Sequence, residues 1–307
     1  MLELTNLKGN TWAVLSPVNV GVCVKDGEVA LIDTGASPDA GRRVLKLVKE
    51  KGWSVKWIVN THCHADHIGG NHFIQKRTEC GLAASPLEAA CIEHTAFETN
   101  WLWSAAAPRV IRTNFMEAEP SQVTKLLSPG EELEGWGLRA VDLSGHSHGQ
   151  IGLTTPDGVF FTGDAVIAPR VLAKYGIPFV ADSVKMLDTF DRLEAMAADL
   201  FVPSHGEVCT DVRPLVQVNR ECVLNLRAEL LSICEKPRTR DEIVAALAQS
   251  HNISIDLGQY VLTESAASAL ITPLLDEGLL AADFSGGTLR LARAETVERQ
   301  PSGTDKN

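Results

Sequence analysis

The chain of 307 residues lacks the usual features of membrane, secreted and disulfide-stabilised proteins. It has no run of about 18 or more apolar residues, which argues against a transmembrane helix. The N-terminal segment MLELTNLKGNTWAV does not show the basic and then apolar pattern of a secretory signal. Seven cysteines, an odd number at wide intervals, do not form the pattern of a disulfide framework. We therefore expect a reducing, cytoplasmic location.

Positive charge is also scarce. The chain has 28 lysines and arginines against 39 aspartates and glutamates, giving a net charge of -11 and a pI of about 5.3. Such a charge repels a phosphate backbone at long range and disfavours nucleic-acid binding. The hydrophobic share of 45% is ordinary for a globular protein, and the length suits one large domain with a small one.

Up to residue 85, strand patterns alternate with helix patterns. Runs rich in β-branched residues and closed by Gly, Asp or Pro predict strands, and helical spacing of apolar residues predicts helices. The expected strands are 11–17, 19–27, 28–35, 55–60 and 80–85, and the expected helices are 38–53 and 71–77. This alternation indicates an α/β fold.

From residue 86 the order changes. Residues 86–127 have the pattern of interrupted helices and form an insertion. The segments that follow are strands at 131–144, 150–157, 158–166 and 200–204, and helices at 182–197, 212–235, 240–250 and 264–280, with a hairpin at 281–293. The last elements have the order of a winged helix-turn-helix. We expect a large domain over 1–212, a connecting helix over 213–235, a winged-helix-like domain over 236–295 and a disordered tail over 296–307.

The stretch VNTHCHADHIGGN contains an unusual concentration of ligand-type side chains, directly after a buried-strand pattern. His62 and His64 lie two residues apart, so an extended backbone projects both side chains from the same face and turns Cys63 into packing. Asp66 and His67 follow on a turn or a first helical residue. One loop therefore offers ligands in two directions, enough for two metal ions. Imidazole and carboxylate without thiolate suit zinc, and also iron or manganese.

One loop does not complete two coordination shells, so further ligands are needed downstream. Three candidates stand where apolar strand patterns end, each next to a glycine: His146 in LSGHSHG, Asp164 in FFTGDAV and His205 in VPSHGEV. A glycine at such a position lets the backbone turn a side chain into a shared cleft. Together with the first loop, these residues predict a metal centre at one edge of the sheets.

The series LIDTG, THCHADH, GHSHG, TGDA and PSHG resembles the metallo-β-lactamase superfamily over roughly residues 10–208. The resemblance implies an αββα sandwich with a metal site at one sheet edge. It also implies two sets of ligands with one bridge: His62, His64 and His146 for the first metal ion, Asp66, His67 and His205 for the second, and Asp164 between them.

Four further residues are candidates around this centre. Asp33 matches a family aspartate behind the site, where it would orient a ligand, and it could instead be a strand-end turn former. His148 stands where the family usually has proline; hydrogen bonding near the metals and proton transfer are open, and we favour capping of the turn. Lys174 and Tyr175 either stabilise an oxyanion or are an ordinary solvated lysine and packed tyrosine.

The expected function is hydrolysis of a small carbonyl ester, thioester or lactone by a dinuclear centre. Two divalent ions, zinc first and iron or manganese as alternatives, would share a bridging hydroxide, with Asp66 as the catalytic residue that orients it. The alternatives are a metal-dependent ribonuclease or phosphodiesterase, a β-lactamase, and a mono-iron persulfide dioxygenase. The first motif also resembles glyoxalase II-type thioesterases, whose glutathione-binding C-terminal segment is not recognisable in this chain.

The insertion offers aromatic surface over the expected cleft. Phe97, Trp101, Trp103 and Phe115 either form a lid that binds an acyl or aromatic substrate or pack the insertion on the sandwich. Trp101 and Trp103 are therefore candidate substrate residues.

The C-terminal elements resemble the winged helix of relatives that include RNA-cleaving enzymes. However, residues 241–289 contain no lysine or arginine, and residues 236–294 hold five basic against seven acidic residues. A helix that reads a nucleic-acid groove needs phosphate contacts to position it. We therefore expect a small-molecule substrate and no specific nucleic acid. One apolar helix face is expected to be core, packed on the first domain or in a homodimer: Ala267, Leu270, Ile271, Leu274 and Leu275.

Overall fold

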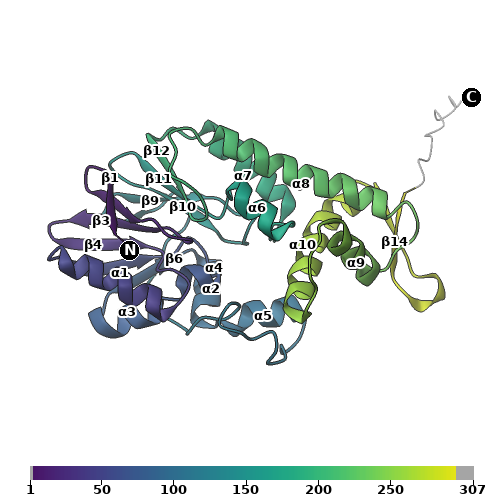
Figure 1. The fold of residues 1–307 in the computed structure, drawn as a ribbon, viewed down its shortest axis with the longest axis horizontal. Helices are drawn as coiled ribbons and strands as arrows, with labels where there is room; N and C mark the ends of the chain where they lie inside the picture. Colours follow the sequence, from purple (N-terminus) through teal and green to yellow (C-terminus); the bar gives the residue numbers. More distant parts are fainter. Residues whose placement is uncertain (1–2, 295–307) are drawn as a thin grey trace, which may run out of the picture.

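The structure is a computed structural model that describes residues 3–294, so the expected tail at 296–307 lies outside the described residues (Figure 1). A seven-stranded sheet has the strands in sequential order: β1 Leu4–Lys8, β2 Thr11–Val14, β3 Val20–Lys25, β4 Glu28–Ile32, β5 Ser54–Val59, β6 Gly81–Ala84 and β7 Lys125–Leu126. Strands β1 to β4 are antiparallel neighbours, and β4 to β7 are parallel neighbours.

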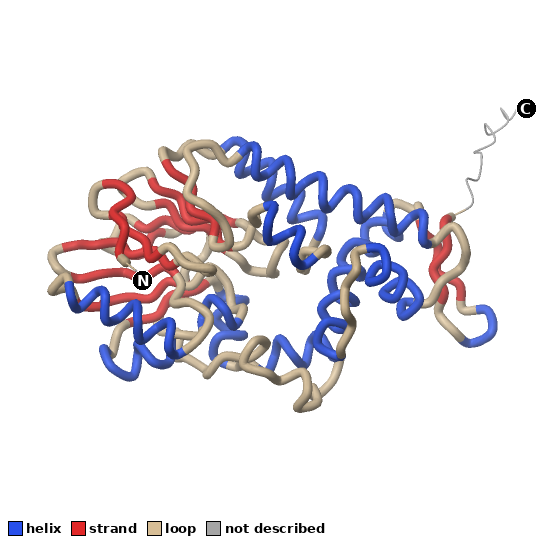
Figure 2. The backbone as a smooth tube through the Cα atoms, viewed as in Figure 1, coloured by secondary structure: helices blue, strands red, loops and turns tan. Residues whose placement is uncertain are grey.

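A second sheet of five strands has the order β12-β11-β10-β9-β8. Its strands are β8 Glu132–Leu133, β9 Leu138–Asp142, β10 Ile151–Thr154, β11 Val159–Gly163 and β12 Leu200–Pro203. Figure 2 shows the two sheets on one side of the molecule and a largely helical region on the other. The helices of the first half are α1 Pro38–Glu50, α2 Ala65–Ile68, α3 Asn71–Thr78, α4 Pro86–Glu93 and α5 Ala96–Trp103.

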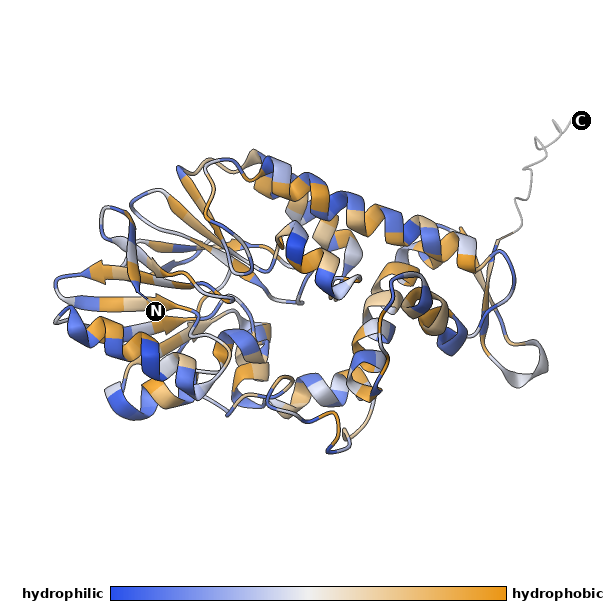
Figure 3. Cartoon of the chain, in the orientation of Figure 1, coloured by the Kyte–Doolittle hydropathy of each residue, from blue (hydrophilic) through white to orange (hydrophobic). Residues whose placement is uncertain are grey.

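Alternation along the strands produces the layers of the sandwich. In β4, Val29 and Leu31 pack with α1 and α3 on the outside of the first sheet, whereas Ala30 and Ile32 face the second sheet. Successive side chains of a strand point to opposite faces, so one apolar run fills two layers. The strands are accordingly mostly hydrophobic in Figure 3. The expected αββα sandwich is confirmed.

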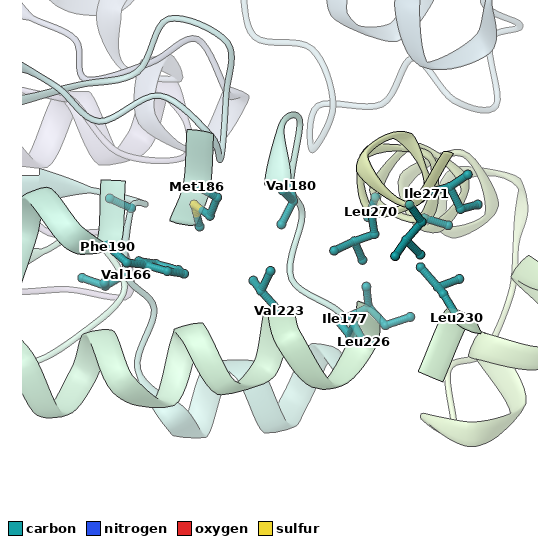
Figure 4. Packing of buried hydrophobic residues seen from close by; sticks show 14 of the residues in the cluster. Val166, Ile177, Val180, Met186, Phe190, Val223, Leu226, Leu230, Leu270 and Ile271 are labelled. Carbon is teal, nitrogen blue, oxygen red and sulfur yellow. The ribbon is translucent and has the colours of Figure 1, made fainter. Parts of the chain in front are cut away.

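A third apolar layer joins the second sheet to the C-terminal helices. Its helices are α6 Pro169–Tyr175, α7 Ser183–Ala195, α8 Arg213–Ile233, α9 Arg240–Ser250 and α10 Leu257–Asp276. In Figure 4, Leu226 and Leu230 of α8 point toward Leu270 and Ile271 of α10, and Val223 of α8 points toward Val180. Helix α10 is therefore packed against the sandwich through α8.

The end of the described chain has the predicted order of helix, helix and hairpin. The hairpin pairs β13 Leu280–Asp283 with β14 Arg290–Arg293. Its assignment as a winged helix, and the division of the chain into domains, stay predictions. The prediction that Leu275 belongs to the buried apolar face is wrong, because this residue is 36% exposed. The other members, among them Leu270 and Ile271, are buried as predicted.

Several predicted boundaries need correction. The segment 131–144 is two strands, because the turn at residues 134–137 contains two glycines with positive φ. Helix α10 begins at Leu257, earlier than the predicted 264, because Asp256 caps it by accepting a hydrogen bond from the backbone N–H of Gln259. Strands β1 and β7 and helix α6 were not predicted. Helix α6 is short and has no buried residue, so it lacks the apolar periodicity that marks a helix.

Two compositional expectations can be compared with the structure. All seven cysteines lie among the described residues, and all are free. Within residues 3–294, no helix is both long and apolar enough to cross a membrane.

Candidate metal centre

The expected ligands lie just beyond the ends of four strands. His62 and His64 follow β5, and His146, Asp164 and His205 follow β9, β11 and β12. These strand ends meet at one edge of the two sheets, so residues far apart in the chain become neighbours. Loops at the ends of a rigid sheet are a common place for binding residues.

Close packing holds the first ligand loop against the start of α1. A Cβ atom on Gly69 would lie 2.5 Å from the backbone of Ala36 and Ser37, and one on Gly70 would lie 2.6 Å from the carbonyl oxygen of Thr34. The paired glycines therefore let the loop approach more closely than any other residues would. Directly before them, the one-turn helix α2 carries Asp66 and His67, as predicted for a turn or first helical residue.

Three histidines form the first group. Ligand atoms of His62, His64 and His146 all lie within 4.8 Å of one another. His146 Nε2 is 3.0 Å from His64 Nδ1, although the two residues come from different sheets. The structure thus brings together the three side chains that the sequence assigned to one ion.

The second group contains Asp66, His67 and His205, whose ligand atoms also lie within 4.8 Å of one another. His205 Nε2 is 3.1 Å from Asp66 Oδ2. Asp164 lies between the groups: its Oδ2 is 3.3 Å from His205 Nε2 and 3.6 Å from His146 Nε2. This is the position expected of a bridging ligand.

Each of these histidines is also held from behind through its other ring nitrogen. The five outer contacts are His62 Nδ1 with Thr61 Oγ1, His64 Nε2 with Glu98 Oε1, His67 Nδ1 with Asp33 Oδ2, His146 Nδ1 with the Phe179 carbonyl and His205 Nδ1 with the Pro17 carbonyl, at 2.8–3.3 Å. A hydrogen bond at one ring nitrogen fixes the tautomer and leaves the other nitrogen free to bind. The inward nitrogen is Nδ1 for His64 and Nε2 for the other four.

The inward atoms fit a bound cation. His62 Nε2, His67 Nε2 and Asp164 Oδ1 are buried and make no hydrogen bond within the protein. Buried polar atoms are normally paired, so this cluster needs a ligand that is not part of the chain. Imidazole and carboxylate donors without a thiolate suit a divalent ion such as zinc.

Charge within the cluster supports the same conclusion. Burial would lower the pKa of His205, yet Asp164 and Asp66 raise it to about 10. Burial also opposes ionisation of Asp164, but His67 and His205 hold the pKa of this carboxyl well below its ordinary value. By contrast, burial lowers the pKa of His64 and His146 to about 4, so both rings are neutral at pH 7. Neutral imidazoles and ionised carboxylates are the forms that bind a metal, so His205 has to release its proton when an ion binds.

Asp33 occupies the position expected for the residue behind the site. Its side chain is 1% exposed, and it accepts hydrogen bonds from the Thr61 backbone N–H at 2.9 Å and the Thr61 hydroxyl at 2.8 Å. It also contacts His67 Nδ1 at 2.9 Å. Because the Thr61 hydroxyl donates to Asp33, its oxygen can accept from His62 Nδ1. One carboxylate therefore orients a histidine of each group.

A model of the metallo-beta-lactamase superfamily matches residues 13–205, the part of the chain that carries all seven expected ligands. The chain belongs to this superfamily. The family and the His/Asp clusters together indicate that it binds a divalent metal ion.

Curated relatives of this superfamily member are hydrolases by name. A hydroxyacylglutathione hydrolase from Erythrobacter litoralis is 29% identical over 66% of this chain and 69% of that protein. A probable metallo-hydrolase from Methanocaldococcus jannaschii is 24% identical over 58% of this chain and 82% of that protein. Hydroxyacylglutathione hydrolases from Brucella species are 26% identical, but the match spans 59% of their length. The chain is therefore a metal-dependent hydrolase.

Solved structures extend the likeness in fold beyond the catalytic sandwich. A beta-lactamase domain protein from Burkholderia ambifaria has a TM-score of 0.72 at 21% identity and covers 95% of this chain and 93% of that one. A metallo-beta-lactamase family protein from Thermus thermophilus has a TM-score of 0.68 at 22% identity and covers 95% of this chain and 98% of that one. At this coverage the shared fold includes the C-terminal helices.

A cavity of about 190 Å³ adjoins the ligand cluster of this superfamily member. His64, Asp66, His146, Asp164 and His205 face it at one end. The remaining wall is largely apolar and comes from the insertion, the segment around α6, and α10. The cavity is smaller than the ~300–1,000 Å³ typical of sites for drug-sized ligands.

The other candidate residues lie in different places. Tyr175 lines the cavity, and Lys174 Nζ lies 3.3 Å from its hydroxyl oxygen without lining the cavity itself. Trp101 and Trp103 are not among the lining residues. His148 is exposed, and its ring centroid is 4.9 Å from that of Trp101.

The insertion aromatics divide between the two interpretations. Phe97, Trp101, Trp103 and Phe115 are 53%, 47%, 38% and 65% exposed, and Trp101 contacts His148 on the loop after β9. Of the four, Phe115 lines the cavity. The insertion also packs against α10 through smaller apolar residues, which the sequence pattern does not reveal.

Two glutamates of the insertion were missed. Glu88 is 2% exposed and accepts hydrogen bonds from the backbone N–H groups of Cys63 and Gly149, both at 2.8 Å, so it ties the two ligand loops together. Glu98 lines the cavity beside His64, and burial, reinforced by Glu88, raises its pKa well above the ordinary value. Neither residue belongs to a motif, so no sequence signal distinguishes them from other helix glutamates.

Proposed function

We propose that this chain is a dinuclear metal-dependent hydrolase that cleaves a small carbonyl ester, thioester or lactone. The observation that carries the proposal is the cavity: an ionised ligand cluster at one end and an apolar wall at the other. Such a site suits a neutral acyl group whose carbonyl reaches the cluster. A ribonuclease would need cationic side chains along a nucleic-acid track, and the described lining residues of the cavity include no lysine or arginine.

The proposed ligand sets are those expected from the sequence. His62, His64 and His146 would hold one ion, and Asp66, His67 and His205 would hold the other. Asp164 would bridge them, because its two oxygens reach toward histidines of both groups. Zinc is the proposed metal, with iron and manganese as the alternatives that the same donors accept.

When bound, such a pair of ions would supply a water with a lowered pKa and polarise the substrate carbonyl. The protein's own residues would then orient the reactants. Asp66 faces the cavity, and although burial opposes its ionisation, His67 and His205 hold its pKa at about 2. It is therefore ionised at neutral pH and can accept a hydrogen bond from the attacking water.

The overall reaction is balanced by one water. Its oxygen forms a bond to the acyl carbon, the C–S or C–O bond of the substrate breaks, and the leaving sulfur or oxygen takes a proton. Tyr175 lines the cavity, and its hydroxyl oxygen accepts a hydrogen bond from Lys174 Nζ. The tyrosine O–H is then free to donate to the oxygen of the substrate as negative charge develops on it.

The names of the curated relatives support the chemical class. Several are hydroxyacylglutathione hydrolases, whose printed name denotes hydrolysis of an acyl derivative of glutathione. We propose the same class of reaction, cleavage of an acyl bond, for this chain. We do not propose glutathione as part of its substrate.

Two measurements on the full chain test the proposal. Elemental analysis of freshly purified protein should find two divalent ions per chain. A panel of thioesters, esters, lactones, β-lactams, phosphodiesters and single-stranded RNA, at equal enzyme and physiological salt, should show turnover of the acyl substrates that chelation abolishes. One ion per chain at full loading would refute the dinuclear centre. Metal-dependent RNA cleavage without acyl turnover would make the chain a ribonuclease instead.

A further inference from the structure

The apolar wall of the cavity is assembled from three segments that are distant in sequence. These are residues 115–116 of the insertion, 167–179 around α6, and 259–266 in the first half of α10. The C-terminal region is therefore not a remote appendage. It supplies one side of the cavity that opens on the ligand cluster.

Helix α10 is anchored in this position by its second half. Leu270 and Ile271 are buried against Leu226 and Leu230 of α8 (Figure 4). The Ser183 hydroxyl, at the start of α7, donates a hydrogen bond of 2.7 Å to the Ala269 carbonyl. Side chains on the first half of α10 are thus held at a fixed distance from the ligand cluster.

The first half of α10 is also held by the insertion. Val261 is buried in a cluster with Leu102, Ile111 and Met116, and Leu262 packs against the same cluster. The insertion and α10 therefore support each other across the cavity, and Figure 1 shows α5 and α10 meeting there. A wall supported from both sides can discriminate between ligands by size.

Charge at the cavity restricts its occupant further. The described lining residues include the acids Asp66, Glu98 and Asp164 but no lysine or arginine. An anionic group placed against the apolar wall would be buried without a cationic partner, which is costly. The part of the substrate that enters this region must therefore be neutral.

We propose that the cavity binds an uncharged, apolar acyl chain and that Leu262 and Ala266 of α10 set the length of chain it accepts. This inference rests on the proposed hydrolysis of acyl esters, thioesters or lactones, and it names their acyl group. Ala266 is 2% exposed and lines the cavity with a single methyl group, so a larger residue there shortens the space. Leu262 lines the same wall with a long side chain, so truncation extends the space.

Binding of n-alkyl methyl ketones to the metal-loaded full chain tests the pocket without turnover. A methyl ketone has the shape of an acyl group but no leaving group to hydrolyse. Titration calorimetry should show affinity that rises about fourfold per added methylene until the pocket is full, as expected for burial of apolar surface. A methyl ketone of equal length that ends in a hydroxyl group should bind at least about tenfold more weakly, because the hydroxyl would be buried against the apolar wall without a partner.

Two variants shift the length preference in opposite directions. Ala266→Leu should lower the binding affinity for the longer ketones by about tenfold or more and leave the affinity for the shortest ketone unchanged. Leu262→Ala should extend the preference to longer ketones. Ala245→Leu is the matched control, because Ala245 is exposed on α9 and does not line the cavity. A folding defect would lower the binding affinity for all ketones together. It cannot shift the preferred chain length in opposite directions in the two variants.

The results separate this inference from the proposed function. Affinity independent of chain length, equal binding of the hydroxyl-ended ketone, or equal effects of Ala266→Leu and Ala245→Leu would overturn the acyl pocket. Turnover of acyl thioesters without any preference for chain length would support the proposed hydrolase function and reject the proposed acyl pocket. Length-dependent ketone binding without turnover of any ester, thioester or lactone would retain the pocket and reject the proposed function.

Discussion

The ligand cluster and the wall that faces it are built in different ways. In the cluster, every histidine is fixed by a contact at its outer ring nitrogen, and the contacts come mostly from the sheets and their loops. The wall is made by α6, the insertion and α10, and it retains exposed aromatic side chains such as Phe115 and Tyr175. The ligand geometry thus depends on the sandwich, whereas the proposed selection of the substrate depends on the segments added around it.

Two buried carboxylates show the same difference on a smaller scale. Asp33 follows β4, receives hydrogen bonds from Asn60 and Thr61, and contacts His67. Glu98 belongs to α5 of the insertion and contacts His64 at 3.3 Å. The first is held by the sandwich at both carboxylate oxygens, whereas the second is carried by a helix of the insertion. Substitutions at the cluster, at Asp33 and at Glu98 should therefore have effects of decreasing size.

Asp164→Ala should have the largest effect. The variant removes the carboxylate that lies between both ligand groups, so at least one ion per chain should be lost. Catalysis should fall by about a thousandfold or more, because a pair of ions contributes several kcal/mol to the transition state. Elemental analysis and kcat/KM on the best acyl substrate measure the two effects.

Asp199→Ala serves as its control. Asp199 is an exposed aspartate that pairs with Lys8, and it does not line the cavity. This variant should keep both metal content and turnover. If Asp164→Ala retained two ions and full activity, the bridging assignment would be wrong.

Asp33→Asn should have the second largest effect, on both ions at once. It keeps the shape of the side chain but removes an acceptor that reaches His67 directly and His62 through Thr61. Loss of such an outer contact lowers metal affinity by about 10–100-fold. Competition with a chelator under zinc-limited conditions measures the affinity of each site.

Thr61→Val separates the effect of Asp33 on the group that contains His62 from its effect on the group that contains His67. The valine removes the hydroxyl between Asp33 and His62 and leaves the contact with His67 in place. We expect it to weaken the group that contains His62 and to spare the other. Equal weakening of both sites by Thr61→Val would show that Asp33 acts through the general packing of the loop.

Glu98→Gln should have a smaller effect, below about tenfold on metal affinity. Glutamine keeps the size of the side chain and can still contact His64 Nε2 through its amide oxygen. The site that contains His67 and His205 should be unchanged, because Glu98 does not contact either residue. A loss as large as that of Asp33→Asn would mean that the insertion fixes the cluster as firmly as the sandwich does.

The sequence predicted the cluster far better than the wall, for a physical reason. A metal centre needs particular side chains at strand ends, and those residues are visible one by one: His62, His146, Asp164 and His205 each follow an apolar run. An apolar wall needs only suitable size and position, which any apolar helix can supply. Ala266 therefore looks like core, although it lines the cavity.

The insertion illustrates the limit most clearly. Trp101 and Trp103 attract attention in the sequence because aromatic residues dominate binding surfaces. In the structure, α5 turns both outward, and Leu102 between them is the residue that packs toward α10. Which face of a short helix is buried depends on contacts with residues more than a hundred positions away, and these leave no local pattern. Glu88 and Glu98 were missed because their partners in the ligand loops, 25–61 positions away, likewise leave no local pattern.

Addition of nucleic acid should have the smallest effect, namely none. Two of the five cations that flank the C-terminal helices are paired within the protein: Arg240 contacts Glu264, and Arg290 contacts Glu242 at 3.4 Å. Because residues 241–289 supply no cation, α10 has nothing with which to neutralise phosphates. Fluorescence anisotropy of labelled RNA and duplex DNA, titrated with the full chain from low to physiological salt, should show no saturable binding. Tight binding that weakens steeply with salt would assign the C-terminal helices to nucleic acid, and the acyl pocket would then be a by-product of their packing.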